Sequence, residues 1–356
     1  MPRRIEKKQR LDIRKKRLDE VRPFAYTFGV EMEFISEFGY IATAEIIKRT
    51  YDFMFADDYG ELNLTYEGYN HNDHEGNNAP WKIVSDSSVR STNRNQQGME
   101  LVSPILENQD GYLMLQRVVE VMERLQAKGK FSVNKTCGLH VHLGTQYMTP
   151  EEVIKFATNY IRSESAIDLL VPPSRRIAGR IGYCASNVAN MVNHTGNKIP
   201  NQMPIAVSIA MDNLRTCLRD VSKNATKQDK LDIISQVIPT RFVKLNLSSL
   251  HRNTHKTIEV RHFGGSLDVQ KIHGWLHTLD YMYRMSRTQV AFKKPESSRN
   301  TEPKGNFRRL SAWFDVEPEV QAWVKGRKKE LAQADARRKR NARRRKNYAK
   351  ANAERS

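Results

Sequence analysis

The sequence predicts an α+β fold in which a largely antiparallel sheet has helices packed on one face. At least six stretches have the apolar pattern of a strand, and at least six have that of a helix. Predicted strands often follow one another without an intervening helix, which is typical of antiparallel sheets. The 356 residues are enough for one large domain or two ordinary ones, and they show no internal repeat.

Strands are expected where apolar residues alternate or cluster in short stretches bounded by turn-forming residues. They are predicted at residues 26–35, 81–84, 98–102, 137–143, 242–247 and 257–263. Polar residues 85–97 form the expected turn between the second and third strands.

Helices are expected where apolar residues recur every three or four positions. The pattern predicts helices at residues 41–54, 111–127, 205–221, 228–238 and 269–291. A further helix should begin after Thr149, because Pro150, Glu151 and Glu152 suit the first turn of a helix capped by threonine. Residues 56–80 and 172–204 have no period and are expected to be loops, of which the first is long enough to act as a lid.

The positive charge is concentrated at the two ends of the chain. The formal net charge is +19, from 59 Lys and Arg against 40 Asp and Glu. Residues 1–22 contain ten Lys and Arg against four Asp and Glu, and residues 325–356 contain fourteen against three. The expected organisation is therefore a basic arm over 1–22, a nearly neutral globular domain over 23–324, and a basic tail over 325–356.

The two basic ends suit contact with a polyanion such as a nucleic acid, because each phosphate that they neutralise releases a counterion. A solvated, frayed terminus explains the same composition, and an anionic membrane surface or an acidic protein would be served equally well. The tail lacks aromatic interleaving and zinc-finger spacing, so sequence-specific readout is not indicated.

The composition also bears on location. No run of about 18 apolar residues is present, which argues against a membrane span. The basic N-terminus is not followed by an apolar segment of the kind found in signal peptides. Three widely spaced cysteines do not form a disulfide framework and fit a reducing compartment, so a cytoplasmic location is expected.

Polar residues spaced two apart occur in three of the predicted strands, with apolar residues in the opposite phase. Side chains at this spacing share one face of a sheet. The pairs are Glu31 and Glu33, His140 and His142, and Glu259 and Arg261, and a further carboxylate, Glu100, lies in the strand at 98–102. Each pair should therefore lie on the face opposite the apolar core.

Carboxylates gathered on one face repel one another unless cations lie among them. Several carboxylates with one or two imidazoles suit Mg²⁺ or Mn²⁺ better than zinc. Arg261, in phase with Glu259, would then suit a clamp for phosphate or carboxylate. The chain has no GxxxxGK[ST], GxGxxG or GxSxG motif, and Cys137 is expected to be a buried structural residue and not a nucleophile.

These residues lie in five motifs that occur in a fixed order. The motifs are GVEMEF at 29–34, Asp86-x-Ser88 followed by GMELVSP at 98–104, CGLHVH at 137–142, Asn246 with Leu247, and TIEVR at 257–261. Together they closely resemble the putative amidoligase family, which is related to glutamine synthetase and glutamate–cysteine ligase. The resemblance covers most of residues 26–275 and leaves out the basic ends.

The resemblance implies a glutamine synthetase-like catalytic fold and an ATP-dependent carboxylate–amine ligase that works through an acyl phosphate. It implies ATP and Mg²⁺ or Mn²⁺ as cofactors, and an amino acid, a peptide or a similar molecule as the carboxylate and amine substrates. The metal ligands that it implies are Glu31, Glu33, Glu100, Glu259 and one or both of His140 and His142.

The remaining site residues follow from the same resemblance. Arg261 would stabilise the transferred phosphoryl group, and Arg175 or Arg176 would bind phosphate or the acidic substrate. Asp86 would orient the amine or bind metal, and Asn246 would contact the cofactor or satisfy backbone groups. Lys244, in the opposite phase from Leu245, could also reach the site.

Two other functions remain open on the sequence alone. A metal-dependent hydrolase also often begins its site with a His-x-His strand, and it would hold zinc tightly and have no use for ATP. A non-enzymatic nucleic-acid-binding or assembly protein on the same scaffold would account for the basic ends.

Overall fold

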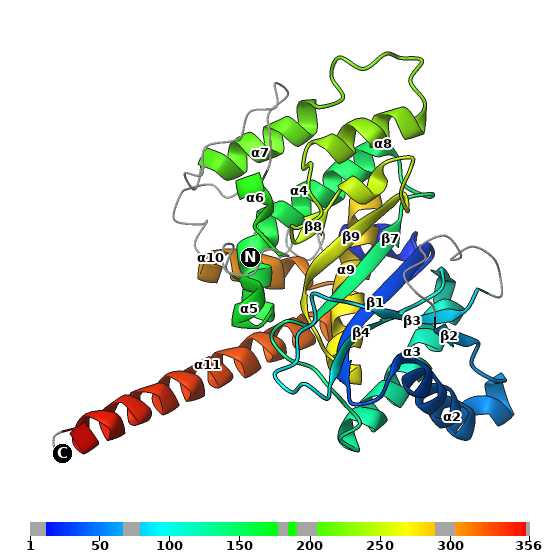
Figure 1. Cartoon of the computed structure of the whole chain (residues 1–356). Coiled ribbons are helices and arrows are strands. Elements are labelled where there is room, and N and C mark those ends of the chain that lie inside the picture. The colour runs from blue at the N-terminus through cyan, green and yellow to red at the C-terminus, as the bar shows by residue number, and fades with distance from the viewer. Residues whose placement is uncertain (1–11, 67–78, 177–183, 191–204, 289–302, 354–356) are drawn as a thin grey trace.

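One open sheet organises the chain, with its strands in the order β2-β3-β4-β1-β7-β9-β8 (Figure 1). The computed structural model describes residues 12–66, 79–176, 184–190, 205–288 and 303–353. The strands are β1 (Thr27–Ser36), β2 (Leu64–Tyr66), β3 (Trp81–Ser85), β4 (Gln97–Val102), β5 (Leu106–Glu107), β6 (Phe131–Ser132), β7 (Gly138–Gly144), β8 (Leu245–Asn246) and β9 (Thr257–Gly264).

Most strand pairs are antiparallel, and the exception is β2, which runs parallel to β3. The short strands β5 and β6 pair with opposite ends of β1. These pairings confirm the α+β class and the mostly antiparallel sheet that the sequence predicts.

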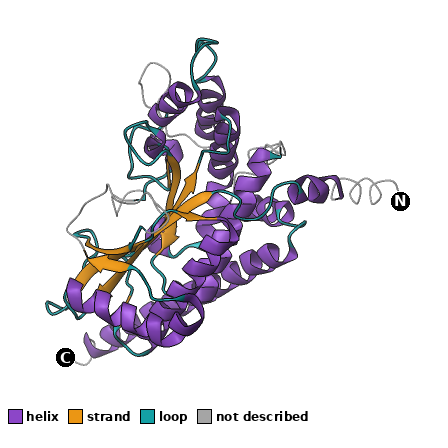
Figure 2. Cartoon of the chain, turned by 90° about the vertical axis from the view of Figure 1, so that its right-hand side faces the viewer, coloured by secondary structure: helices purple, strands orange, loops and turns teal. Residues whose placement is uncertain are grey.

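The helices complete the fold and lie beside the twisted sheet (Figure 2). The longer helices are α2 (Tyr40–Tyr59), α3 (Asn108–Ala127), α4 (Pro150–Ile167), α7 (Ile205–Thr216), α8 (Lys227–Gln236), α9 (Val269–Arg287), α10 (Pro303–Trp313) and α11 (Pro318–Ala353). The short ones are η1 (Asp168–Leu170), α5 (Pro173–Arg176), α6 (Asn187–Asn190) and η2 (Ser248–Leu250). Among the described helices, none combines the length and the apolar character needed to cross a bilayer.

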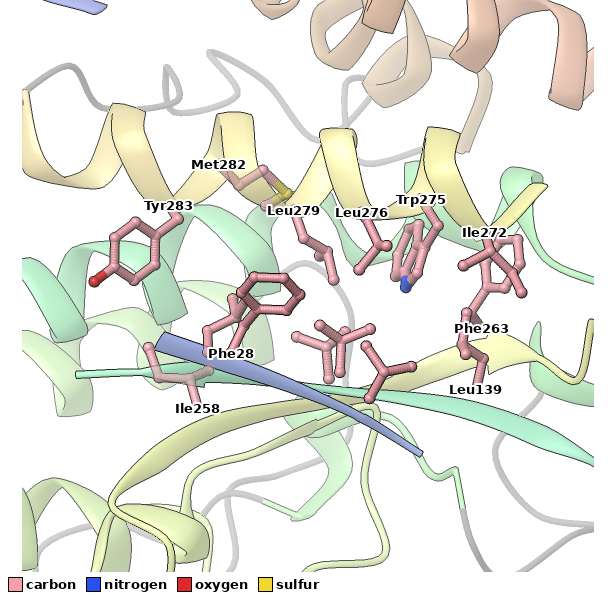
Figure 3. Close-up of a cluster of buried hydrophobic side chains, with 14 of the residues drawn as sticks. Phe28, Leu139, Ile258, Phe263, Ile272, Trp275, Leu276, Leu279, Met282 and Tyr283 are labelled. Atoms are coloured by element: carbon pink, nitrogen blue, oxygen red, sulfur yellow. The ribbon is translucent and has the colours of Figure 1, made fainter. Parts of the chain in front are cut away.

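The main core lies between the sheet and α9 (Figure 3). Leu139 on β7 and Ile258 on β9 are fully buried there, on the side of the sheet that faces α9. Phe263 stacks on Trp275, with ring centroids 5.0 Å apart. Leu139 and Ile258 occupy the apolar phase of their strands, and the register shift between the Leu139–Phe263 and Val141–Val260 pairs brings Phe263 to the same face. The polar residues Glu259 and Arg261, which come before Phe263 in β9, lie on the opposite face of the sheet.

The start of α4 is built as its sequence predicts. The Thr149 side chain accepts a hydrogen bond from the backbone N–H of Glu152, whose carboxylate accepts one from the backbone N–H of Thr149. This reciprocal capping box satisfies two backbone donors that an uncapped helix would leave unpaired. The helix that begins there packs against α9, α10, α7 and α8.

Several expected boundaries differ from the structure. Residues 56–80 do not form one loop, because α2 continues to Tyr59 and β2 follows at Leu64–Tyr66; the segment 67–78 lies outside the described residues. The helix expected at 205–221 ends at Thr216, and the strand expected at 242–247 is only two residues long. Residues 172–204 include short helices α5 and α6, while 177–183 and 191–204 also lie outside the described residues.

Parts of both basic ends pack on the domain. Residues 12–19 are helical, Leu18 is 2% exposed, and Arg14 Nη1 donates a hydrogen bond of 2.8 Å to Asp315 Oδ1. At the other end, α11 crosses residue 325 without a break, and its first turns pack on α9. The contact there is close, since a Cβ on Gly274 would lie 2.0 Å from Trp323 Nε1. The far end of α11 projects away from the sheet (Figure 1).

Candidate metal centre

Four neighbouring strands, β4, β1, β7 and β9, place acidic and histidine side chains on the same face of the sheet. The strand register sets these residues directly opposite one another across each pair of strands. The opposed pairs are Glu33 and Glu100, Glu31 and His140, and His142 and Glu259. The structure therefore brings together all six residues that the sequence suggested as metal ligands.

Glu31 lies between the two imidazoles. Its Oε2 is 2.9 Å from His140 Nδ1, and its Oε1 is 3.0 Å from His142 Nε2. The other ring nitrogen of His142 is 3.0 Å from Thr257 Oγ1. Both carboxylate oxygens of Glu31 thus face a histidine, which makes Glu31 the central residue of the group.

His140 also contacts the other two carboxylates of its neighbourhood. Its Nε2 is 3.2 Å from Glu33 Oε1, and its Nδ1 is 3.8 Å from Glu100 Oε1. The second oxygen of Glu33 accepts a hydrogen bond of 2.6 Å from the backbone N–H of Gly138. The start of β7 therefore fixes the position of Glu33 on β1.

Glu259 is held at the other end of the row by three polar side chains. Its Oε2 accepts hydrogen bonds from Asn246 Nδ2 at 2.6 Å and from Ser249 Oγ at 3.2 Å. Its Oε1 is ion-paired with Arg261 Nη1. Arg261 Nε is buried and has no hydrogen-bond partner in the part of the chain that the structure describes, so the guanidinium has donor capacity to spare.

The side chains form three overlapping groups. Within each group, the candidate ligand atoms lie within 4.8 Å of one another. The groups are Glu31, His142 and Glu259; Glu31, Glu100 and His140; and Glu33, Asp86 and Glu100. A donor set rich in carboxylate oxygen with one imidazole suits Mg²⁺ or Mn²⁺. The residues therefore fit a divalent cation, and Asp86, on the turn after β3, joins them as an additional carboxylate.

Glu100 is buried among other carboxylates, and its pKa is raised as a result. Burial raises the pKa of Glu100 well above its ordinary value, and the charges of Glu31, Glu33 and Asp86 raise it further. Without a cation, this group favours holding a proton. A divalent cation would supply the missing positive charge and release that proton.

The pKa values of the neighbouring groups shift in the direction expected for ion pairs. Burial alone would raise the pKa of Glu31, but the two histidines lower it well below its ordinary value. Burial likewise opposes the charged form of His142, yet the charges of Glu31 and Glu259 raise its pKa. Burial alone would also raise the pKa of Glu259, but Arg261 and then His142 lower it.

Arg175 and Arg176 are consecutive on α5 but point to different parts of the molecule. Arg175 is 4% exposed, and its Nη2 lies 3.9 Å from Glu33 Oε2 and donates to the carbonyl of Thr136 at 3.3 Å. Arg176 instead pairs with Asp335 on α11, with Nη1 and Oδ2 2.6 Å apart. The structure thus brings Arg175 to the acidic face and places Arg176 with α11.

Lys244 lies in a second buried network. Its Nζ donates to Asp168 Oδ1 at 2.7 Å and to Glu164 Oε1 at 3.1 Å. Asp168 Oδ1 is also 2.7 Å from Nε2 of the fully buried His262. These bonds join β9 and the residue just before β8 to α4 and η1, so the structure places the Lys244 ammonium in a bridge between elements.

Sequence reasoning missed two residues that shape the site. Ser249 contacts Glu259 from the short helix η2, and only its spacing of three from Asn246 hints at this role. Gly138 leaves room where a Cβ would lie 2.6 Å from Arg175 Nη2 and 2.9 Å from His140 Nε2. Cys137 beside it is 1% exposed, and burial raises its pKa to about 11, as expected of a structural cysteine.

Comparison with known proteins agrees with the motifs. Residues 25–282 match the family described as putative amidoligase enzyme. The matched region contains every strand of the sheet and all of the residues in the acidic and histidine groups. No curated protein matches the chain. On the strength of this match over most of its length, the chain belongs to the putative amidoligase family.

Proposed function

We propose that the protein is an ATP-dependent carboxylate–amine ligase that forms an amide or isopeptide bond through an acyl phosphate. The observation that carries this proposal is the row of four glutamates and two histidines on one sheet face, ending at Arg261, in a chain of the amidoligase family. The open, mostly antiparallel sheet is compatible with a glutamine synthetase-like catalytic fold, which is part of the proposal.

The metal ligands are proposed from the overlapping groups. Glu31 is shared by two groups, each of which also has one histidine, so we assign one imidazole to each of two cations. Glu259 completes the group of His142, and Glu100 that of His140; Glu33 and Asp86 lie at the far end of the row. Bound Mg²⁺ ions would supply charge neutralisation for phosphate oxygens.

The arginines are proposed to hold the reacting anions. Arg261 is oriented by its ion pair with Glu259, and its Nε has no hydrogen-bond partner among the described residues, so it is suited to stabilise negative charge on the transferred phosphoryl group. Arg175 is buried beside Glu33 and is assigned to the phosphate or the acidic substrate. Arg176 is left out of this role because its guanidinium pairs with Asp335.

In the proposed reaction, a carboxylate oxygen of one substrate attacks the γ-phosphorus of ATP, and ADP leaves. The nitrogen of an amine substrate then attacks the acyl phosphate, inorganic phosphate leaves, and the nitrogen loses a proton. Asp86, half-buried at the edge of the row, is proposed to orient the amine. Its Oδ1 accepts a hydrogen bond of 2.7 Å from the backbone N–H of Ser88, which fixes the carboxylate.

The full chain should be incubated with ATP, Mg²⁺ or Mn²⁺, and a panel of amino acids and small peptides paired with amines. We expect ADP release that requires the metal, the carboxylate and the amine, with an amide product found by mass spectrometry. Hydroxylamine in place of the amine should trap the acyl phosphate as a hydroxamate. The double variant Glu31→Ala with Glu259→Ala should lose this activity.

A matched control is the double variant Glu45→Ala with Glu61→Ala, which removes two exposed glutamates that lie on α2 and just after it, outside the row, and should retain activity. The absence of metal-dependent ATP binding to the folded chain would overturn the ligase proposal. Tightly held zinc, with hydrolysis that ignores ATP, would point to a hydrolase. An unchanged function in cells that express the Glu31 and Glu259 variant would point to a non-enzymatic role.

A further inference from the structure

The far part of α11, residues 336–347, is a basic rod that the proposed ligase chemistry does not use. Every residue of this segment is exposed. Eight of its twelve residues are Arg or Lys, and none is acidic. The basic residues are Arg337, Arg338, Lys339, Arg340, Arg343, Arg344, Arg345 and Lys346.

The near part of the same helix differs sharply from the rod. Val320 and Val324 are 5% and 0% exposed, and Leu331, at 8%, is the last buried apolar residue among the residues of α11 up to 347. The near part therefore anchors α11 to the domain, and the rod extends beyond that anchor (Figure 1). A helix held at one end presents its other end as a rigid element, and every residue of the rod is exposed.

The charges surround the rod on all sides. Consecutive residues of an α-helix are about 100° apart, so four in a row cover the whole circumference. Residues 337–340 do this once and residues 343–346 do it again. The remaining residues of the rod are two alanines and two asparagines, so it has no apolar stripe.

This distribution distinguishes between anionic partners. A membrane surface would meet only one side of the rod, and helices that lie in membranes bury an apolar face that the rod lacks. The major groove of B-form DNA is about 12 Å wide and admits a helix of about 10–12 Å diameter. Phosphates line both walls of that groove, so cations on the two opposite sides of a helix that face the walls both find partners. The major groove of an A-form RNA duplex is too narrow.

We propose that residues 336–347 bind double-stranded DNA by lying in its major groove and contacting the phosphates on both walls. The segment is roughly 18 Å long at 1.5 Å per residue, enough to follow about five base pairs. The contacts are to the backbone, so binding is expected to be largely independent of sequence. This inference does not depend on the ligase proposal.

The test uses the full chain and fluorescence anisotropy with a labelled 20-base-pair DNA duplex of mixed sequence, from about 50 to 200 mM salt. The variant in which Arg337, Arg338, Lys339 and Arg340 are all changed to Gln should bind at least tenfold more weakly. Its salt slope should fall by about 0.9 for each phosphate that the variant no longer neutralises. The matched control changes four exposed basic residues of the domain to Gln, namely Arg49, Lys128, Arg219 and Lys223.

The control variant has the same change in net charge but leaves the rod intact, so it should retain its affinity within about twofold. An attraction that depended only on total charge would instead weaken both variants equally. A second variant, Ala342→Pro, keeps every charge but interrupts the helix, and should lose the preference for duplex over single-stranded DNA. Circular dichroism and thermal melting should show that each variant is folded.

Three results would overturn the proposal. They are equal weakening by the rod and domain variants, equal binding to an RNA duplex or single-stranded DNA, and tighter binding to phosphatidylserine vesicles than to DNA. Loss of ligase activity in the Glu31→Ala variant, with DNA binding unchanged, would show that DNA binding by the rod does not depend on the ligase activity.

Discussion

Asn246 donates a hydrogen bond of 2.6 Å from its side-chain Nδ2 to Glu259 Oε2, across the last pair of strands in the sheet. Both residues are buried, at 2% and 4% exposure. The same Asn246 nitrogen also donates to Ser249 Oγ, which itself lies within hydrogen-bonding distance of Glu259. Asn246 is therefore a positioning residue for a proposed metal ligand.

The change Asn246→Ala should weaken Mn²⁺ binding roughly 10- to 100-fold, the range typical for loss of a group that orients a ligand. Isothermal titration of the folded variant with Mn²⁺ measures this. Asn253→Ala, which alters an exposed asparagine in the following turn, is the control and should bind Mn²⁺ normally. Unchanged affinity in the folded Asn246→Ala protein would contradict the positioning role.

The stability of the cation-free protein should depend on Glu100 in a definite direction. Its pKa in the folded chain is raised by burial and by its acidic neighbours, so protonated Glu100 stabilises the fold. That contribution is complete below the ordinary value of 4.5 and is lost as the pH rises through the raised pKa. Each unit of pKa difference corresponds to about 1.4 kcal/mol.

Glu100→Gln removes the ionisation but keeps the shape, so its advantage over the parent in free energy of unfolding should grow as the pH increases above 4.5. Urea titrations in EDTA at several pH values measure the difference. Saturating Mn²⁺ should reverse it, because the parent gains more from the cation. A difference in the free energy of unfolding that does not change with pH would show that the acidic neighbours do not raise the pKa of Glu100.

Gly138→Ala should disrupt the site more than the fold. The added Cβ would lie 2.6 Å from Arg175 Nη2 and 2.9 Å from His140 Nε2, so both side chains would have to move. We expect Mn²⁺ affinity to fall at least tenfold, measured by titration. The control is Gly326→Ala, where a Cβ meets nothing within 4 Å and the better helix former should add up to about 1 kcal/mol. Normal Mn²⁺ binding by Gly138→Ala would refute this packing account.

Cys137 should react slowly in the native protein. Burial raises its pKa to about 11, so little thiolate is present at pH 7.5. We expect iodoacetamide to label Cys137 on the order of a hundredfold more slowly in the native chain than in urea, measured by mass spectrometry of peptides. Cys137→Ala should keep metal binding. Rapid native labelling would reopen the nucleophile interpretation.

The face of the sheet that carries each candidate ligand could be predicted from the sequence because it depends only on local alternation. The spacing of Glu31 and Glu33, like that of His140 and His142, assigns each pair to one face whichever strands are neighbours. The strand order and the register that set Glu33 opposite Glu100 depend on pairings between distant segments. Pairings between distant segments produce no periodic pattern in the sequence, so the strand order and the register could not be predicted from it.

The directions of Arg175 and Arg176 show a second limit of local patterns. Identical neighbours on a short helix give no sign of which one faces the site. Their partners decide it: Glu33 lies on β1, and Asp335 lies 159 residues after Arg176. The docking of α11 is equally non-local, since it needs Gly274 to admit Trp323.

The opposite directions of Arg175 and Arg176 also have a thermodynamic consequence. The short helix α5 contacts the acidic face through Arg175 and contacts α11 through Arg176. A displacement of α5 therefore disturbs the candidate metal centre and the docking of α11 together. If a cation bound at the acidic face changes the affinity of the rod for DNA, linkage requires bound DNA to change the affinity for the cation by the same factor. Arg176→Gln should remove that shared factor while leaving each ligand able to bind alone, as titrations of Mn²⁺ with and without DNA would reveal.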